Sequence, residues 1–426
     1  MKDILKSVIT EFQQRDLPAI RKRSLKIDID VPMITTLIGV RRSGKTYMLY
    51  NIIKTVTARG VSIDNILFLN FEDERITMQT SDLDLILQSY SELYPDKNLN
   101  ECYFFFDEIQ NVTGWEKFVR RIFDNYSKHI FISGSNARLL STEIAGALRG
   151  RTITYTVYPL SFEEYLDFKE ITYHVVNPSA RAKVIHAARE LITHGGFPET
   201  IDFSDGVRIK VLQSYFNTMI FRDIVERYKI NDVQVLKFFI KKLFSNIGKP
   251  LSVNKIYNDL RSQGYKVSNN YLYEFEQYVY TVFLGIPVPR FSYSEIKQAK
   301  SEKKLYAIDT GLLSAVEFSI SENRGKLLEN AVLLELVKAG REVLYFKDKY
   351  ECDFIVRDGS SLKALQVAWQ LEDDTTQSRE IRGLVEACRK LNLQHGQIIC
   401  FDHKKRIEKD GVAVEITPFF EWIRTV

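Results

Sequence analysis

Eight residues near the start of the chain, Gly39 to Thr46, read GVRRSGKT and fit the pattern G-x-x-x-x-G-K-[ST] in full. The two glycines let the backbone bend so that its N–H groups can point at phosphate oxygens. Lys45 supplies a charge for the β- and γ-phosphates, and Thr46 supplies a hydroxyl for Mg²⁺. A glycine-rich turn with a chance lysine is the alternative, but the strand-like run before the motif and the helical pattern after it favour nucleotide binding. The sequence therefore predicts a site for ATP and Mg²⁺ formed by Gly39, Val40, Arg41, Arg42, Ser43, Gly44, Lys45 and Thr46.

Two adjacent carboxylates, Asp107 and Glu108, end the apolar run CYFFFDEI. At the carboxyl edge of a parallel sheet they would lie where ligands bind in doubly wound folds. Asp107 is predicted to hold Mg²⁺ through its waters, and Glu108 to act as the general base toward the attacking water. A solvated strand end is the alternative interpretation, which the phosphate-binding motif upstream disfavours.

Three further polar groups have both a functional and an ordinary structural explanation. Ser135 or Asn136, in ISGSNA, could sense the γ-phosphate or orient the water, while Asn136 could equally cap a following helix. Arg149 and Arg151 are each candidates for an arginine finger, in the same chain or in a neighbouring subunit, or are solvated loop residues. The acidic residues of NFEDERI could reach water or Mg²⁺ or simply form a polar loop; they are Glu72, Asp73 and Glu74.

The elements that must position these residues alternate between strand and helix. Between the strand-like runs lie amphipathic helical patterns, which predict a parallel sheet covered on both faces. The fold class is therefore α/β, with a P-loop NTPase sheet preceded by a charged helical lead-in at residues 1–30. The predicted strands are 33–40, 65–71, 102–109, 129–135 and 152–159.

The pattern changes after Pro159. A helical region follows, interrupted by the loop HGGFPET. Three helical segments and two short strands come next, an order that predicts a winged helix. The last segment alternates helix and strand again and predicts a small α/β unit. We therefore predict four domains, at residues 1–160, 161–234, 235–315 and 320–426.

Taken together, the motifs resemble a large prokaryotic family of AAA-type ATPases, similar to the signal-transduction branch, over nearly the whole chain. The resemblance implies an ATPase core with an added strand, a helical lid, a winged helix and a C-terminal domain similar to PD-(D/E)XK nucleases. It also favours Asn136 or Ser135 as the sensor, and Arg151 over Arg149 as the finger. The motifs are GVRRSGKT, NFEDER, FFFDEIQNVTGWEKFVR, FISGSNARLLS, LRGR, YPLSFEEYL and GGFPE.

A nuclease of that type needs a helix glutamate, a strand aspartate and Glu-x-Lys on the next strand, which together hold a metal and place a water. Glu329 and Asp353 match the first two positions, but the third reads Gln366-Val367-Ala368. Gln is a neutral, weak ligand and Ala cannot replace Lys, so the domain is predicted to be inactive as a nuclease. Glu351 or Lys363 could compensate only from the correct strand face.

The winged helix could bind DNA or a protein. Four lysines in or beside the wing suit phosphate contacts, although such a hairpin is more often merely soluble. Two glutamates of the third helix, Glu274 and Glu276, would repel phosphate, so protein docking is slightly favoured over DNA. A protein partner or a homo-oligomer is therefore expected ahead of nucleic acid. The wing lysines are Lys297, Lys300, Lys303 and Lys304.

Composition bounds the remaining classes. The net charge of +4 over 426 residues neither requires nor excludes nucleic acid. Four dispersed cysteines form no CxxC pair, no signal peptide opens the chain, and no apolar run approaches membrane-spanning length, so a cytoplasmic location without a membrane is expected. We predict a Mg²⁺-dependent ATPase switch that controls its attached domains. The alternatives are an ATP-dependent DNA-processing nuclease and a non-catalytic nucleotide-dependent scaffold, which Glu108 disfavours.

Overall fold

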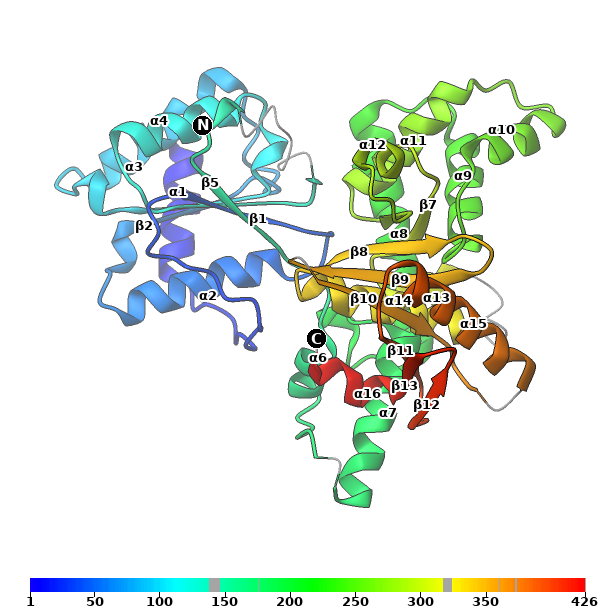
Figure 1. Ribbon diagram of the computed structural model, residues 1–426. Helices are drawn as coiled ribbons and strands as arrows, with labels where there is room; N and C mark the ends of the chain where they lie inside the picture. Colours follow the sequence, from blue (N-terminus) through cyan, green and yellow to red (C-terminus); the bar gives the residue numbers. More distant parts are fainter. Residues whose placement is uncertain (138–145, 175, 317–323, 360, 372–373, 426) are drawn as a thin grey trace. The chain divides into compact units, whose positions relative to one another are not determined.

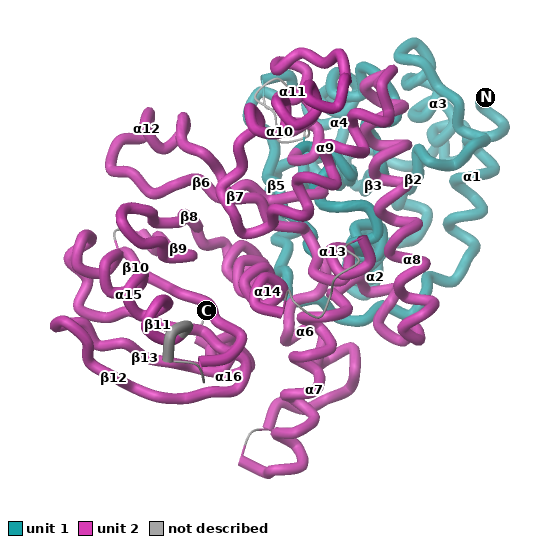
Figure 2. The backbone as a smooth tube through the Cα atoms, turned by 90° about the vertical axis from the view of Figure 1, so that its right-hand side faces the viewer, with its two compact units in different colours: residues 1–158, 281–283 teal, residues 159–280, 284–426 magenta. Residues whose placement is uncertain are grey.

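The computed structural model describes residues 1–137, 146–174, 176–316, 324–359, 361–371 and 374–425. These residues form two compact units (Figure 2). Unit 1 contains residues 1–158 and 281–283 and carries the GVRRSGKT motif; unit 2 contains residues 159–280 and 284–426. Among the described residues, no helix combines the length and the apolar character that a membrane crossing demands.

Unit 1 is built on five parallel strands in the order β2-β3-β4-β1-β5 (Figure 1). The predicted α/β fold with a parallel sheet is confirmed. Strand β4 lies between β1 and β3, so three strand ends that carry candidate site residues are immediate neighbours. The strands are β1 (Ile34–Ile38), β2 (Ile66–Asn70), β3 (Tyr103–Asp107), β4 (Ile130–Gly134) and β5 (Thr152–Thr156).

Helices cover both faces of this sheet because successive strand side chains point to opposite sides. Phe105 of β3 packs with α2 (Lys45–Ala58), whereas Phe104 and Phe106 pack in the core of α3 (Asp84–Leu93) and α4 (Trp115–Asn125). Helix α1 (Lys2–Gln14) contributes to both cores and contacts β2 and α3. The prediction of a helical lead-in to residue 30 is therefore right only as far as Gln14; residues 15–33 form neither helix nor strand.

Unit 2 begins with helices whose starts are marked by capping residues. Ser161 and Glu164 form a capping box at the start of α6 (Phe162–Phe168). Asn177 caps α7 (Pro178–His194), which has a proline in its first turn. Helix α8 (Asp205–Thr218) continues directly into a π-helical stretch, Met219–Glu226.

Three more helices and a hairpin follow. Asp232 and Ser252 accept the capping hydrogen bonds of α9 (Val233–Ser245) and α10 (Val253–Ser262). Two antiparallel strands then flank a short helix. These last elements are α11 (Asn269–Thr281), β6 (Gly285–Pro289), α12 (Glu295–Ala299) and β7 (Lys303–Ala307).

The C-terminal part of unit 2 holds a mixed sheet of six strands in the order β12-β13-β11-β10-β9-β8. Its helices are α13 (Thr310–Val316), α14 (Arg324–Lys338), α15 (Asp374–Lys390) and α16 (Phe419–Trp422). Helix α15 packs on β9, β10, β11 and β13, and α14 on β8 and β10. The strands are β8 (Glu342–Lys347), β9 (Glu351–Asp358), β10 (Ser361–Val367), β11 (His395–Cys400), β12 (Lys405–Lys409) and β13 (Val412–Pro418).

Strand β12 was not predicted from the sequence. Its five residues read KRIEK, so no apolar alternation marks it. It pairs with β13 at the sheet edge, and its single apolar residue, Ile407, packs against the core. All four cysteines are buried and unbridged. They are Cys102, Cys352, Cys388 and Cys400.

Candidate functional site

The GVRRSGKT loop joins β1 to α2 and its backbone requires glycine at its first position. Gly39 has φ of 149°, and a Cβ placed on it would lie 2.2 Å from the carbonyl oxygen of Val157. Gly44, which precedes α2, has φ of 99°. The loop therefore folds tightly against the segment after β5, and the first N–H groups of α2 have no partner within the helix.

Lys45 points back into this loop. It is 4% exposed, and its ammonium donates to the carbonyl oxygens of Gly39 and Val40 at 3.1 and 3.2 Å. The same ammonium lies 3.3 Å from a carboxylate oxygen of Glu108. The positive charge that the sequence assigns to phosphate is thus placed inside the loop and paired with the predicted general base.

Glu108 is held by donors from two strand ends. Its Oε2 accepts hydrogen bonds from the side chain of Gln110 and from the backbone N–H of Ser135, the latter at 3.1 Å. Although burial favours the neutral acid, the Lys45 ammonium, the Gln110 amide and the Arg41 guanidinium outweigh it and lower the pKa of Glu108 to about 2. Glu108 is therefore ionised, and its φ of 52° is the left-handed conformation often found at functional sites.

Asp107 faces the start of α2. Its Oδ2 accepts a hydrogen bond from the Thr46 hydroxyl at 2.7 Å, and its Oδ1 accepts one from the Ser133 hydroxyl of β4. Burial and the neighbouring Glu108 carboxylate raise the pKa of Asp107 to about 6, against these two hydrogen bonds. A hydroxyl and a carboxylate are thus placed together, as the predicted Mg²⁺ site requires.

These residues fit the triphosphate and the Mg²⁺ that the motif implies. A fully buried hydroxyl, that of Ser43, has no hydrogen-bond partner among the described residues and lies within the loop. Oxygen ligands of the kind Mg²⁺ prefers are adjacent in Thr46 and Asp107. Lys45 and the start of α2 supply the positive charge and the N–H groups that phosphate needs.

Three residues that contribute to this site were not predicted from the sequence. Arg23, from the lead-in, donates to the carbonyl oxygens of Ser43 and Tyr158 and ties the loop to the chain after β5. Ser133 bonds the carboxylate of Asp107 and also accepts the backbone N–H of Glu108 at 3.1 Å. Gln110 contacts Glu108. No sequence motif marks Arg23, but Ser133 sits in the strand ISG, one position before its end.

The remaining candidates lie at two places in unit 1. Ser135 and Asn136 are buried directly after β4, beside Glu108, so both sensor candidates are in the predicted region. Arg41 and Glu72 form an ion pair at 2.7 Å, so this acidic residue reaches the loop through Arg41. The residues that Asn136 would cap, 138–145, lie outside the described part of the chain.

Arg151 lies at the opposite end of the sheet from the loop. Its carbonyl accepts the backbone N–H of Ile34, the first residue of β1, whereas the loop follows the last residue of β1. Five strand residues separate these ends by about 13 Å. The side chain of Arg151 is paired instead with Asp124 of α4 at 3.0 Å, so it does not face the loop of its own chain.

The carboxylates of the C-terminal domain gather around a lysine from another element. Lys304 of β7 is fully buried, and its ammonium lies 2.8 Å from Glu351, 3.3 Å from Asp353 and 3.6 Å from Glu329. Across the described residues, no three His, Cys, Asp or Glu side chains are placed to hold a metal. Gln366 accepts the backbone N–H of Asp353. The residues singled out for nuclease chemistry do meet, but around an internal cation.

This arrangement changes the interpretation of the wing lysines. Lys297 and Lys300 are exposed, but Lys304 is inaccessible to any phosphate. Burial and the Glu329 carboxylate raise the pKa of Asp353 to about 8 despite the Lys304 ammonium. One ammonium therefore does not compensate three carboxylates fully.

Three protein-family models match successive parts of the chain. A family model described as an AAA domain matches residues 32–166. Two further models match the rest, a domain of unknown function (DUF8612) at residues 185–324 and another (DUF4143) at residues 324–419. The phosphate loop and its carboxylates thus all fall within the first match.

Two relatives are similar along almost their whole length, and both are uncharacterized. A protein of Methanocaldococcus jannaschii is 34% identical over 420 residues, which cover 95% of this chain and 91% of the relative. A protein of Haemophilus influenzae is 29% identical over 389 residues, covering 90% of this chain and 93% of that protein.

Solved structures show only remote similarity. The Aeropyrum pernix Orc1 protein in complex with DNA aligns with a TM-score of 0.30 and 12% identity, over 74% of this chain and 90% of that one. Cdc6p from Pyrobaculum aerophilum aligns with a TM-score of 0.25 and 14% identity, over 68% and 88%. These scores support no functional comparison.

Proposed function

We propose, on the premise that this chain belongs to the family of its archaeal relative and carries an AAA-type P-loop NTPase domain, that it is a Mg²⁺-dependent ATPase switch. One observation carries the proposal: Thr46 contacts Asp107 and Lys45 contacts Glu108, which brings both carboxylates to the phosphate loop. A scaffold that only binds nucleotide has no need of a buried, ionised glutamate at that place.

Each residue has a stated role in this proposal. The loop N–H groups and Lys45 hold the phosphates, and Thr46 and Asp107 hold Mg²⁺, which when bound neutralises developing phosphate charge. Glu108 accepts the proton of the attacking water. Ser135 and Asn136, after β4, are assigned the role of orienting that water or sensing the γ-phosphate.

The pairing of Lys45 with Glu108 suggests how the basicity of Glu108 is kept low before nucleotide binds. A carboxylate with a pKa near 2 is a weak base, and it is weak largely because the Lys45 ammonium lies 3.3 Å away. When Lys45 binds phosphate, Glu108 loses part of its counter-charge and becomes more basic.

Arg151 is proposed to act on a neighbouring subunit. Since it lies at the end of the sheet opposite its own loop, any finger role requires the loop of a second copy. This makes homo-oligomer formation part of the proposed mechanism. Nucleotide-dependent contact between copies would then be the signal passed to the attached domains.

ATP hydrolysis by purified variants tests the proposal. Lys45→Ala should abolish nucleotide binding, and Glu108→Gln should bind ATP but hydrolyse it about a hundredfold or more slowly, the range for a lost general base. Glu74→Gln is the matched control, because this exposed glutamate also follows a strand but forms no ion pair with Lys45 in the described structure. Wild-type turnover in Glu108→Gln would show that the assigned base is wrong.

A further inference from the structure

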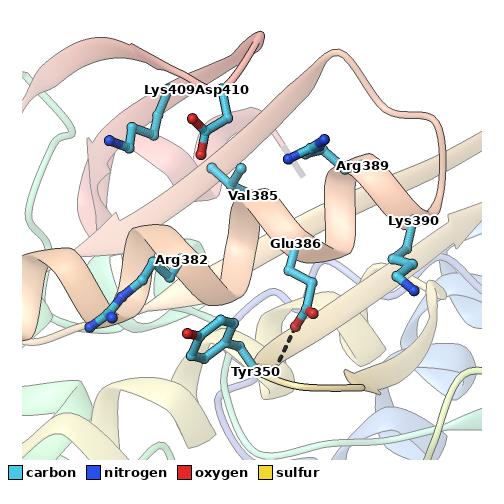
Figure 3. Close-up of a pocket in the computed structure, with 8 residues that line it drawn as sticks. All are labelled: Tyr350, Arg382, Val385, Glu386, Arg389, Lys390, Lys409 and Asp410. Carbon is cyan, nitrogen blue, oxygen red and sulfur yellow. Dashed lines mark hydrogen bonds between the residues drawn. The ribbon is translucent and has the colours of Figure 1, made fainter.

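A pocket of about 550 Å³ lies on the C-terminal part of unit 2, and none of its lining residues belongs to the sites described above (Figure 3). It is bounded by α15, by the turn between β8 and β9, and by the turn between β12 and β13. Only one of its lining residues is aliphatic, so it does not suit an apolar ligand. The lining residues are Tyr350, Arg382, Val385, Glu386, Arg389, Lys390, Lys409 and Asp410.

The pocket has an excess of positive charge. Four of its lining residues are basic and two are acidic. Of the two acidic residues, Glu386 is already engaged within the protein, because its carboxylate accepts a hydrogen bond from the backbone N–H of Tyr350 (Figure 3). Of the bases, Lys390 is paired with Asp348 at 3.0 Å. Arg389 and Lys409 have no ion pair within the described part of the chain, which leaves their charges available to a ligand.

The basic residues of α15 form one stripe. Arg382, Glu386, Arg389 and Lys390 are spaced i, i+4, i+7 and i+8, so they share a face of the helix, and the three basic residues are exposed. The two arginines are two helical turns apart, about 10 Å. They can therefore contact two separate phosphates of one extended chain. A single small anion is too small to contact both arginines.

An aromatic ring lies among these cations. The guanidinium of Arg382 and the ammonium of Lys349 each lie 5.5 Å from the ring centroid of Tyr350. Nucleic-acid strands are bound by this combination, in which aromatic rings stack on bases while cations follow the backbone. An acidic peptide would use the cations but would gain little from the ring.

The segment that supplies most of the lining residues is also basic, although three acidic residues, at positions 372–374, precede it in the sequence. Residues 379–410 contain eight Lys and Arg against five Asp and Glu, an excess of three, while the whole chain has an excess of only four. Part of this excess lies on β12, where charged residues also protect an exposed sheet edge from pairing with other chains. That explanation does not extend to Arg382 and Arg389, because they lie on a helix.

We propose that this pocket and the stripe of α15 bind the phosphodiester backbone of a nucleic acid. The arginines contact phosphates, and Tyr350 contacts a base of an unpaired strand. The proposal is independent of ATP hydrolysis and places nucleic acid on the C-terminal domain instead of the wing.

Binding of fluorescently labelled single- and double-stranded DNA to the full chain, followed by anisotropy at several salt concentrations, tests the proposal. The test variant is Arg382→Glu with Arg389→Glu, and a second variant carries Gln at both positions. The matched control is Lys297→Glu with Lys300→Glu, which makes the same charge change on the exposed helix α12 and at the residue directly after it.

We expect the pocket variants to lose at least tenfold in affinity and the salt slope to fall by about two, one for each lost phosphate contact. The wing variant should lose less than threefold, and the pocket variants should keep wild-type ATP hydrolysis, which separates this result from the proposed function. Three results would overturn the proposal: no DNA binding by the wild type at low salt, loss of binding in the wing variant alone, or equal competition by polyglutamate.

Discussion

Lys45 has three acceptors in the described structure, namely two carbonyls of its own loop and the carboxylate of Glu108. A phosphate must therefore compete for an ammonium that is already satisfied. An anionic phosphate attracts the ammonium more strongly than the two neutral carbonyls do, so the main competitor is the Glu108 carboxylate. At the residue scale, the site is preformed in position, and binding would redistribute its hydrogen bonds.

The glycine at position 39 gives a prediction at this scale. Gly39→Ala would place a methyl group 2.2 Å from the carbonyl oxygen of Val157, so the loop must move. We expect ATP affinity to fall at least tenfold in an equilibrium binding measurement, with a stability loss of about 2 kcal/mol.

Gly60→Ala is the control for this substitution. Gly60 also has a positive φ, of 97°, but nothing lies within 4 Å of its Cβ position. It should cost about 1 kcal/mol and leave ATP binding unchanged. Equal loss of ATP binding in both variants would contradict the close approach that we assign to Gly39.

At the scale of elements, one contact ties the hairpin to the C-terminal domain. Lys304 comes from β7, whereas its carboxylate partners come from α14 and β9. Tyr306 of the same strand donates to Glu329 at 2.6 Å. The hairpin is thus anchored through buried charge, and the DUF8612 and DUF4143 matches meet in one compact unit.

Removing that charge should be costly. Lys304→Met leaves Glu329 and Asp353 without their cation, and breaking such a buried pair costs about 3–5 kcal/mol. Glu351 keeps a second partner, Lys347, at 3.3 Å. The midpoint of urea unfolding measures this loss. Adding Asp353→Asn should recover part of the stability, because a neutral amide then replaces a carboxyl whose ionisation burial disfavours.

Lys303→Met, one residue earlier in β7, is the matched control. Lys303 is only partly buried and has no ion pair in the described structure. The free energy of unfolding of this variant should lie within about 1 kcal/mol of the wild-type value. If both lysine variants lose the same stability, the cluster does not act as the anchor of the hairpin.

At the scale of the whole molecule, the position of Arg151 has the largest consequence. Its finger role, if it has one, depends on a second copy of the chain. Arg151→Ala breaks only a partly exposed pair with Asp124, so the variant should fold with little loss of stability.

Hydrolysis by mixed variants measures this dependence. Arg151→Ala alone should lose about a thousandfold in turnover while still binding ATP. Mixing it with Lys45→Ala should restore activity, because one subunit then supplies the arginine and the other the intact loop. Arg149→Ala is the control and should stay active; a mixture that remains inactive although both chains assemble would exclude action between subunits.

Much of unit 1 follows from the sequence because its signals are local. The chain runs directly from a strand of five residues through a loop with two glycines into a helix that begins at Lys45. Their spacing alone therefore determines where Lys45 and Thr46 lie relative to the loop. The same holds for Asp107 and Glu108, which a buried strand must deliver to the sheet edge. Strand β12 shows the limit, because a strand with one apolar residue has no periodicity to detect.

The sequence by itself determined the phosphate loop, its two carboxylates and the α/β class, since each depends on neighbours in the chain. Only the tertiary structure decided that Arg23 and Ser133 complete the loop, that Arg151 lies at the far end of the sheet, and that Lys304 occupies the C-terminal carboxylate cluster. These contacts join residues tens to more than a hundred positions apart. Strand order and packing bring such residues together, and no local pattern encodes that order.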